Sequence, residues 1–173
     1  ILGALSTGFL VYGITWIFGV THETNLFKIT QALPSLPLNT QPGLLFGLGF
    51  VLVAIGFKIA AAPFQFWIPD VYQGAPTAVT LFIASAPKLA AFAIVIRMMV
   101  NGLILSSAPM PPAWQTMLLI LSLLSMAVGN VAAIAQSNLK RMLAYSAISH
   151  MGFMILGLAT GYTENGAAGL LSA

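Results

Sequence analysis

The sequence predicts an all-α, polytopic membrane protein with about five transmembrane helices, one of them broken at Pro63. Two observations carry this prediction. Of the 173 residues, 59% are hydrophobic and only 5% are charged, whereas a soluble globular domain carries roughly 25% charged residues. The sequence also contains several apolar stretches that are each about 20 residues long, the length that spans a bilayer. This composition excludes a soluble fold, a disordered chain and a nucleic-acid-binding protein.

The first apolar stretch covers residues 1–20 and carries no charge. A polar connection follows at residues 22–42, which contains Lys28 and three prolines. Because proline lacks an N–H group and clashes with the preceding turn, these prolines forbid one continuous helix. We expect this connection to lie outside the membrane.

The second span, at residues 43–68, contains Lys58 and is interrupted by Pro63. The proline ring presses on the carbonyl four residues back, at Ile59, so the helix should break or kink one residue after the lysine. The following residues, 64–79, are rich in aromatics and proline, which suits a short half-helix and an interfacial turn. Trp67 and Tyr72 are expected as anchors at the level of the lipid headgroups.

Three further spans are predicted by apolar length. They cover residues 80–100, 114–135 and 142–161, and the connection at 102–113 separates the first of them from the second. Lys140 and Arg141 form the only adjacent basic pair. The excess of basic residues in cytoplasmic connections therefore places the connections at 64–79 and 136–141 in the cytoplasm, which makes these two residues topology determinants rather than catalysts.

Two lysines fall at membrane depth. Counted at about 1.5 Å per residue from their shared connection, Lys58 lies about 15 Å deep and Lys88 about 12 Å deep in a core roughly 30 Å thick. Two ammonium groups in an apolar interior repel each other and lose hydration, so each can gain and lose a proton during a working cycle. Burying a lysine is costly, and such a residue is a functional candidate by default. The alternative for Lys88 is a side chain that reaches up to the interface.

His150 lies about eight residues into the last span, and Ser146 shares its helical face four residues earlier. Together with Ser149 these residues are candidates for a polar relay, although a histidine that hydrogen-bonds a neighbouring helix for packing explains the pattern as well. Asp70 and Glu164 fall in connections, where turn or capping roles are expected. The chain has no cysteine, and its few histidines and acids are too scattered to propose a metal site. We expect no cofactor in this chain.

The chain begins at Ile1 inside an apolar run and stops as another begins. We therefore expect an internal piece of a larger membrane protein.

Two long motifs resemble the antiporter-like, proton-translocating membrane subunits of bacterial respiratory complex I, which are relatives of the Mrp-type sodium/proton antiporter subunits. The first is residues 56–77, GFKIAAAPFQFWIPDVYQGAPT, continued by APK at 86–88, and the second is residues 138–152, NLKRMLAYSAISHMG. The chain departs from the family pattern at Gln65, Gln73 and Ala78, where histidine, glutamate and proline are common.

The resemblance implies about fourteen helices in two inverted five-helix repeats, each with one broken helix. Residues 1–101 would hold the last three helices of the first repeat, 102–113 the connection, and 114–173 the first two helices of the second repeat and the start of a further one. By motif, Lys58 is the broken-helix lysine of the proton half-channel and Lys88 links it to the central hydrophilic axis, while His150, Ser146 and Ser149 match the polar start of the second repeat. The family's partner glutamate and second-half lysine lie outside the chain.

The resemblance further implies a proton-translocating subunit of NADH:quinone oxidoreductase in the bacterial inner membrane. Its partners would be lipid, protons and the other membrane-arm subunits, and NADH, flavin, iron–sulfur clusters and quinone are expected in partner subunits. This chain alone would hold no redox or catalytic site. A secondary cation/proton antiporter subunit, a membrane hydrogenase subunit and a structural scaffold remain alternatives.

Overall fold

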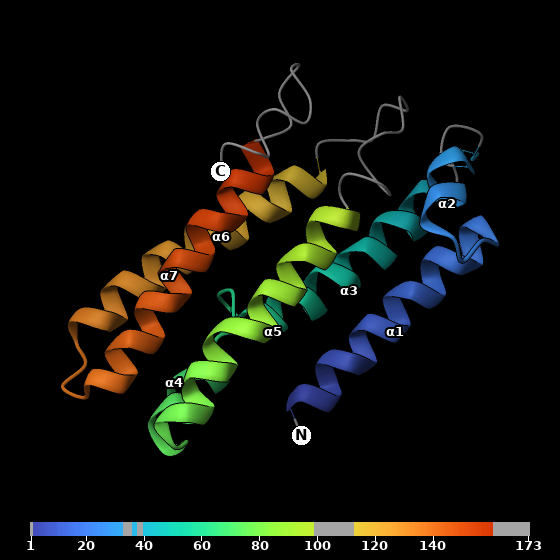
Figure 1. The fold of residues 1–173 in the computed structure, drawn as a ribbon. Coiled ribbons are helices and arrows are strands. Elements are labelled where there is room, and N and C mark those ends of the chain that lie inside the picture. Colours follow the sequence, from blue (N-terminus) through green and yellow to red (C-terminus); the bar gives the residue numbers. More distant parts are fainter. Residues whose placement is uncertain (1, 33–35, 38–39, 99–112, 161–173) are drawn as a thin grey trace. The chain divides into compact units, whose positions relative to one another are not determined.

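The computed structural model describes residues 2–32, 36–37, 40–98 and 113–160, which fold into seven helices and no strands (Figure 1). Five helices are long and apolar enough to cross a membrane, as predicted. The two short helices join longer ones. In chain order the helices are α1 (Leu2–Thr21), α2 (Leu26–Ala32), α3 (Gln41–Ile59), α4 (Trp67–Gly74), α5 (Thr77–Met98), α6 (Ala113–Ile134) and α7 (Leu139–Thr160).

The second span is broken where expected, because α3 ends at Ile59, four residues before Pro63. The half-helix expected after the break is α4. The start of α7 differs from the prediction. The Asn138 Oδ1 accepts hydrogen bonds from the backbone N–H of Lys140 at 2.9 Å and of Arg141 at 3.4 Å, so this asparagine caps the helix. Lys140 and Arg141 therefore lie in the first turn of α7, not in the connection before it.

The connection at 22–42 contains a helix that the sequence did not predict. His22 ends α1 in the left-handed region, with φ 54°, and its N–H bonds the Phe18 carbonyl at 2.7 Å. Asn25 then caps α2 by accepting a hydrogen bond from the Phe27 N–H at 3.0 Å. A helix of seven residues is too short for its apolar period to stand out in a sequence, so only its caps signal it.

The chain packs as two compact units. The first comprises Ile1–Ile55 and Phe92–Trp114, and in it α1 and α3 approach closely at two glycines. A Cβ atom on Gly13 would lie 2.7 Å from the Gly47 carbonyl oxygen. The Ser6 hydroxyl donates across the same helix pair to the Ala54 carbonyl at 3.1 Å. Small residues of this kind let helix backbones approach within a membrane.

The second unit comprises Gly56–Ala91 and Gln115–Ala173 and contains the break, α4 and the α6–α7 hairpin. A Cβ on Gly129 of α6 would lie 2.7 Å from the backbone N of Ser149 on α7, and the Ser122 hydroxyl donates to the Gly152 carbonyl at 2.7 Å. The short helix α4 packs on α7 through a mainly apolar cluster. Its members are Ala60, Ile68, Tyr72, Ala144 and Ile148.

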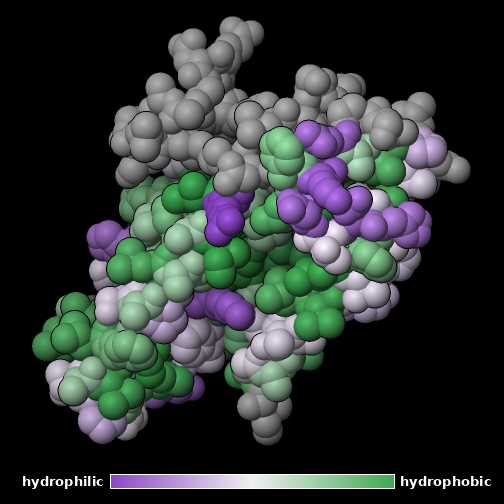
Figure 2. Space-filling model, turned by 45° about the vertical axis from the view of Figure 1, so that its right-hand side comes forward, coloured by the Kyte–Doolittle hydropathy of each residue, from purple (hydrophilic) through white to green (hydrophobic). Residues whose placement is uncertain are grey.

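Large apolar side chains point outward along the spans. Leu81, Val131 and Ile134 are 71%, 72% and 88% exposed, and the face in Figure 2 is mostly hydrophobic where the structure is described. In water such a surface would aggregate, whereas in a bilayer it contacts lipid tails. The chain is thus a multi-pass membrane protein.

Candidate functional site

The break after α3 is a Schellman turn built on an alanine. Ala60 follows the last helical residue and adopts φ 59°. Its N–H bonds the Phe57 carbonyl at 3.3 Å, and the N–H of Ala61 bonds the Gly56 carbonyl at 2.8 Å. Glycine is usual at such a position because it has no Cβ. Here the methyl group of Ala60 is fully buried in the α4–α7 cluster.

Two side chains hold the segment after the break. The buried Ser125 hydroxyl of α6 accepts a hydrogen bond from the Ala62 N–H at 2.8 Å and donates to the Leu121 carbonyl at 2.6 Å. The Trp67 Nε1 donates to the Phe57 carbonyl at 2.9 Å, and the two rings stack with centroids 6.5 Å apart. Ser125 could not be predicted from the sequence, because a lone serine in an apolar span carries no signal of its distant partner.

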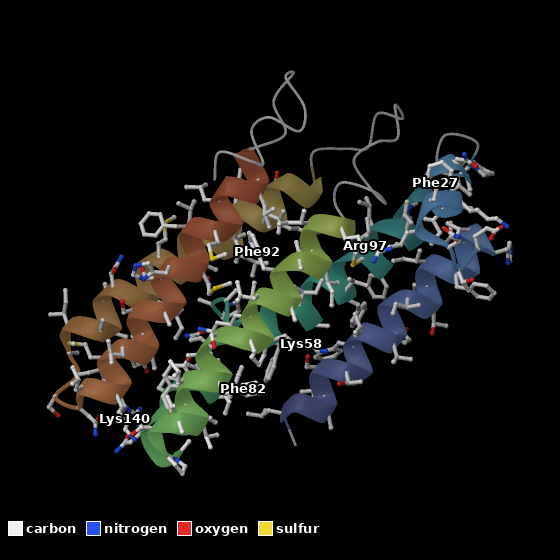
Figure 3. All side chains as sticks on the ribbon, viewed as in Figure 1. Phe27, Lys58, Phe82, Phe92, Arg97 and Lys140 are labelled. Carbon is white, nitrogen blue, oxygen red and sulfur yellow. The ribbon has the colours of Figure 1, made fainter. Side chains whose placement is uncertain are left out.

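Lys58 lies in the last turn of α3, immediately before this break (Figure 3). A cation is favoured there because the last carbonyls of a helix form the negative end of its dipole. Its side chain is exposed on the described chain. Within a bilayer an exposed ammonium at this depth needs polar partners from neighbouring helices or water.

Lys88, in contrast, is buried, with 7% of its surface exposed. Its ammonium nitrogen lies 5.8 Å from the ring centroid of Tyr72, which is itself 3% exposed. Tyr72 was expected as an anchor at the headgroup level, and its depth in the membrane stays a prediction; the structure shows that α7 covers the ring in the apolar cluster. Pro87 lies beside the lysine within α5. Because proline has no N–H, the Ile83 carbonyl has no helical donor.

The acidic residues of the described ranges pair with basic residues other than Lys58 and Lys88. Glu23 lies 3.8 Å from the Lys28 ammonium, and Asp70 lies 2.8 Å from the Arg141 guanidinium. Within the ranges that the structure describes, no carboxylate lies within 4.0 Å of Lys88. The contact with the Tyr72 ring face, which attracts cations, is what the described residues offer its charge.

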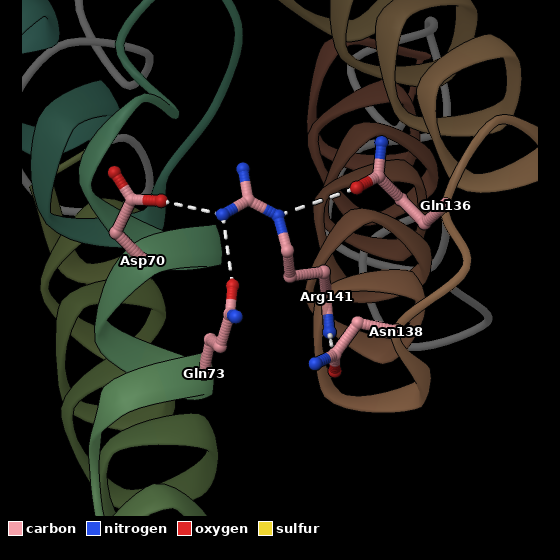
Figure 4. Close-up of polar contacts among 5 residues, drawn as sticks. All are labelled: Asp70, Gln73, Gln136, Asn138 and Arg141. Atoms are coloured by element: carbon pink, nitrogen blue, oxygen red, sulfur yellow. Dashed lines mark hydrogen bonds and ion pairs between the residues drawn. The ribbon is translucent and has the colours of Figure 1, made fainter.

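A polar cluster joins α4 to the start of α7 (Figure 4). The Arg141 Nη1 donates to the Asp70 Oδ1 at 2.8 Å and to the Gln73 Oε1 at 2.9 Å, and its Nε donates to the Gln136 Oε1 at 3.2 Å. Asp70 was expected to serve as a solvated turn or capping residue. Its side chain is 75% exposed and lies in the first turn of α4, and it also pairs with a residue 71 positions away.

Lys140 contributes to the same junction, where its ammonium donates to the Ala75 carbonyl at 3.1 Å, just past the end of α4 (Figure 3). Two cations at the start of a helix oppose its dipole. Their partners offset this unfavourable position, because Lys140 binds the carbonyl just past the C-terminal end of α4 and Arg141 binds Asp70. The connections at 64–79 and 136–141 meet here, as expected for connections on one side of a membrane.

The structure separates the polar residues of α7. The Nδ1 of His150 lies 2.7 Å from the Ser146 carbonyl oxygen and 3.5 Å from the Ser146 hydroxyl, and its side chain is exposed. Because a carbonyl oxygen only accepts hydrogen bonds, Nδ1 carries the proton in this contact. Ser149 is buried and donates to the Asn130 amide oxygen of α6 at 3.2 Å. Ser149 therefore joins α6 to α7, and His150 points elsewhere.

Comparisons with known proteins agree on one family. The family profile described as "NADH:quinone oxidoreductase/Mrp antiporter, TM" matches residues 1–172. The chain is 53% identical over all 173 residues to NADH-quinone oxidoreductase subunit N of Cupriavidus taiwanensis, and 48% identical over 168 residues to subunit N of Coxiella burnetii. It spans 34% of the length of each of these relatives.

A solved structure supports the fold. The structure of the membrane-bound sulfane sulfur reductase, an archaeal respiratory membrane complex, contains a chain that matches 98% of this one with a TM-score of 0.83. The sequence identity is 24%, and the match covers 34% of that chain. At this identity the likeness shows the fold alone.

Proposed function

Because the chain belongs to the NADH:quinone oxidoreductase/Mrp antiporter transmembrane family, we propose that it is part of a proton-translocating membrane-arm subunit of NADH:quinone oxidoreductase. The residues proposed to hold and release the proton are Lys58 and Lys88. Quinone reduction by NADH, with its flavin and iron–sulfur clusters, takes place in partner subunits in this proposal. The chain itself supplies a conduit whose protonation follows that reaction.

The observation that carries the proposal is the burial of Lys88. A lysine that is 7% exposed lies on an apolar span, and no carboxylate pairs with it among the described residues. Keeping its charge there costs free energy. A purely structural span gains nothing from such a group, whereas a proton conduit needs a group whose charged and neutral forms are close in free energy. The break beside Lys58 is compatible with the same function, because irregular backbone at membrane depth is tolerated where it is buried in protein or lines a water-filled cavity, and Ala60, Ala61 and Ala62 are buried.

The chemistry requires only proton exchange. Each lysine ammonium releases a proton toward one neighbour and regains one from another, so a change of charge at one lysine alters the free energy of protonation at the other. His150, Ser146 and Ser149 are proposed to lie on the onward route, with Ser149 hydrogen-bonded to Asn130 at 3.2 Å. The Nε2 of this exposed histidine is available to accept a proton from a group outside this chain.

The proposal includes the repeat organisation of the chain, its orientation in the membrane and its partners. Residues 1–101 and 114–173 belong to successive inverted repeats, separated by the connection at 102–113. The connections at 64–79 and 136–141 face the bacterial cytoplasm, the side that Lys140 and Arg141 favour. The remaining partners are lipid and the other subunits of the membrane arm.

The test uses the full-length subunit in its assembled complex, in membrane vesicles. Lys88→Met and Lys58→Met should each keep assembly but lower NADH-driven proton pumping at least fivefold. Lys28→Met is the matched control, because Lys28 lies outside the spans and pairs with Glu23; it should pump at the wild-type rate. Normal pumping by both span variants would overturn the proposal. Loss of assembly with normal pumping per assembled complex would identify a scaffold instead.

The related alternatives separate by their driving force. A secondary cation/proton antiporter subunit should exchange sodium for protons in vesicles without NADH. A hydrogenase subunit should pump with hydrogen evolution rather than quinone reduction. Proton movement that depends on NADH and quinone excludes both.

A further inference from the structure

Tyr72 carries a buried hydroxyl without a hydrogen-bond partner in the described part of the chain. The residue is 3% exposed. Native proteins pair nearly all buried hydroxyl groups with protein atoms or with ordered water, so an unpaired one calls for an explanation. Packing alone does not explain the hydroxyl, because phenylalanine would fill nearly the same volume without a polar atom.

The residues around this ring limit the possible partners of the Tyr72 hydroxyl. On the α7 side it meets the apolar side chains of Ala144 and Ile148. The charged group set against it is the Lys88 ammonium, 5.8 Å from the ring centroid. The phenolic oxygen is carried on this same ring, so the ammonium and the unpaired hydroxyl share one buried region. Bound water can link two polar groups that lie too far apart for a direct hydrogen bond.

A second buried atom points the same way. The Oε1 of Gln65, just before α4, is buried and has no hydrogen-bond partner among the described residues. Gln65 is 7% exposed. Two unpaired polar atoms beside one eight-residue helix indicate that water reaches this part of the protein.

We infer that Tyr72 is a further proton-path residue, which exchanges protons with Lys88 through bound water. This inference rests on the proposed function. The Lys88 ammonium gives a proton to the bridging water, the water passes one to the Tyr72 oxygen, and the hydroxyl releases its own proton to a water beyond it. Lys88 ends neutral, while the bridging water and Tyr72 end as they began. The excess proton has moved past the ring.

The fold holds the tyrosine in place for this role. An eight-residue helix is too short to be stable alone, and α4 is tied to α7 by Arg141 and Lys140. These contacts and the apolar cluster fix the ring against the buried lysine. The position of the Tyr72 ring is thus determined by the packing of α4 on α7 rather than by the local sequence.

The first test is Tyr72→Phe in the full-length subunit within the assembled complex. We expect unchanged or improved assembly and thermal stability, because only an unpaired hydroxyl is lost and the ring face remains for Lys88. NADH-driven proton pumping should fall at least threefold. The control is Tyr145→Phe, which changes a partly buried tyrosine beside the same cluster and should pump normally.

A second readout separates proton transfer from a structural role. Incorporation of 3,5-difluorotyrosine at position 72 keeps the hydroxyl but makes it more acidic, so the pH profile of pumping should move to lower pH. An unmoved profile, normal pumping by Tyr72→Phe, or a loss of pumping in proportion to lost assembly would each overturn the inference. If Lys88→Met fails to pump while Tyr72→Phe pumps normally, the proposed function stands and only the role of Tyr72 falls.

Discussion

Arg141 at the start of α7 and Asp70 in the first turn of α4 are joined by a 2.8 Å ion pair between Nη1 and Oδ1. The pair is partly solvated, since the aspartate side chain is 75% exposed. Such pairs contribute little by themselves. Arg141 also donates to Gln73 and Gln136, so the arginine contributes more to the junction than the aspartate does.

Arg141→Gln should lower the free energy of unfolding by about 1 kcal/mol, because the lost charge-assisted hydrogen bonds outweigh the relief of a cation at a helix N-terminus. Asp70→Asn should cost about 0.5 kcal/mol or less, since the amide oxygen still accepts from the guanidinium. The double variant should cost no more than Arg141→Gln alone. Thermal unfolding of the full-length protein in detergent micelles measures these changes, and fully additive costs would contradict the coupling.

Ser125→Ala should destabilise the protein by about 1–3 kcal/mol, the cost of leaving a buried donor unpaired. The donor is the N–H of Ala62, which is 1% exposed and bonds the serine hydroxyl at 2.8 Å. Ser85→Ala is the control, because that exposed hydroxyl bonds the Leu81 and Phe82 carbonyls of its own helix and leaves no distant donor unpaired when it is removed. Equal melting temperatures for the two variants would show that Ser125 does not anchor the break.

Gly129→Ala should separate α6 from α7 and cost about 1–3 kcal/mol. The new Cβ would lie 2.7 Å from the Ser149 backbone nitrogen and 2.9 Å from the Tyr145 carbonyl oxygen, neither of which can rotate away. Gly49→Ala meets nothing within 4 Å in α3 and should be neutral or slightly stabilising. The same unfolding assay compares them, and a harmless Gly129→Ala would contradict the close helix contact.

Ala60→Gly should change stability little. The left-handed conformation at φ 59° costs an alanine about 1 kcal/mol, and losing a buried methyl group costs about 0.8 kcal/mol. Ala60→Val should be far worse, by about 2 kcal/mol or more, because a branched side chain is strained at this φ and has no room at a fully buried site. A valine variant that melts like the glycine variant would refute the Schellman turn.

The sequence predicted the spans well because their signal is local. Apolar length and freedom from charge identify a transmembrane helix without knowledge of its neighbours, and Pro63 predicts the break through its own ring and missing N–H. Errors arose where capping decides. Asn138 starts α7 ahead of the predicted bound, and Asn25 starts the unpredicted α2.

The partners of the polar residues were not predictable in the same way. Asp70 was expected in a turn, Tyr72 at the headgroups, and Lys140 and Arg141 as determinants of orientation. Each finds a partner far along the chain: Asp70 binds Arg141, Tyr72 lies under Lys88 and α7, and Lys140 binds the Ala75 carbonyl. Such pairings depend on how helices pack, which leaves no periodic trace in the sequence.

The sequence by itself determined that this chain spans a membrane and that Lys58 and Lys88 are its costly exceptions, because the transfer of a side chain into lipid depends on its own chemistry. Only the tertiary structure decided that the two lysines differ. Lys58 is exposed at the end of a broken helix, while Lys88 is buried against an unpaired tyrosine. Burial is a property of what packs around a residue, and α4 and α7 supply those surroundings from distant parts of the chain.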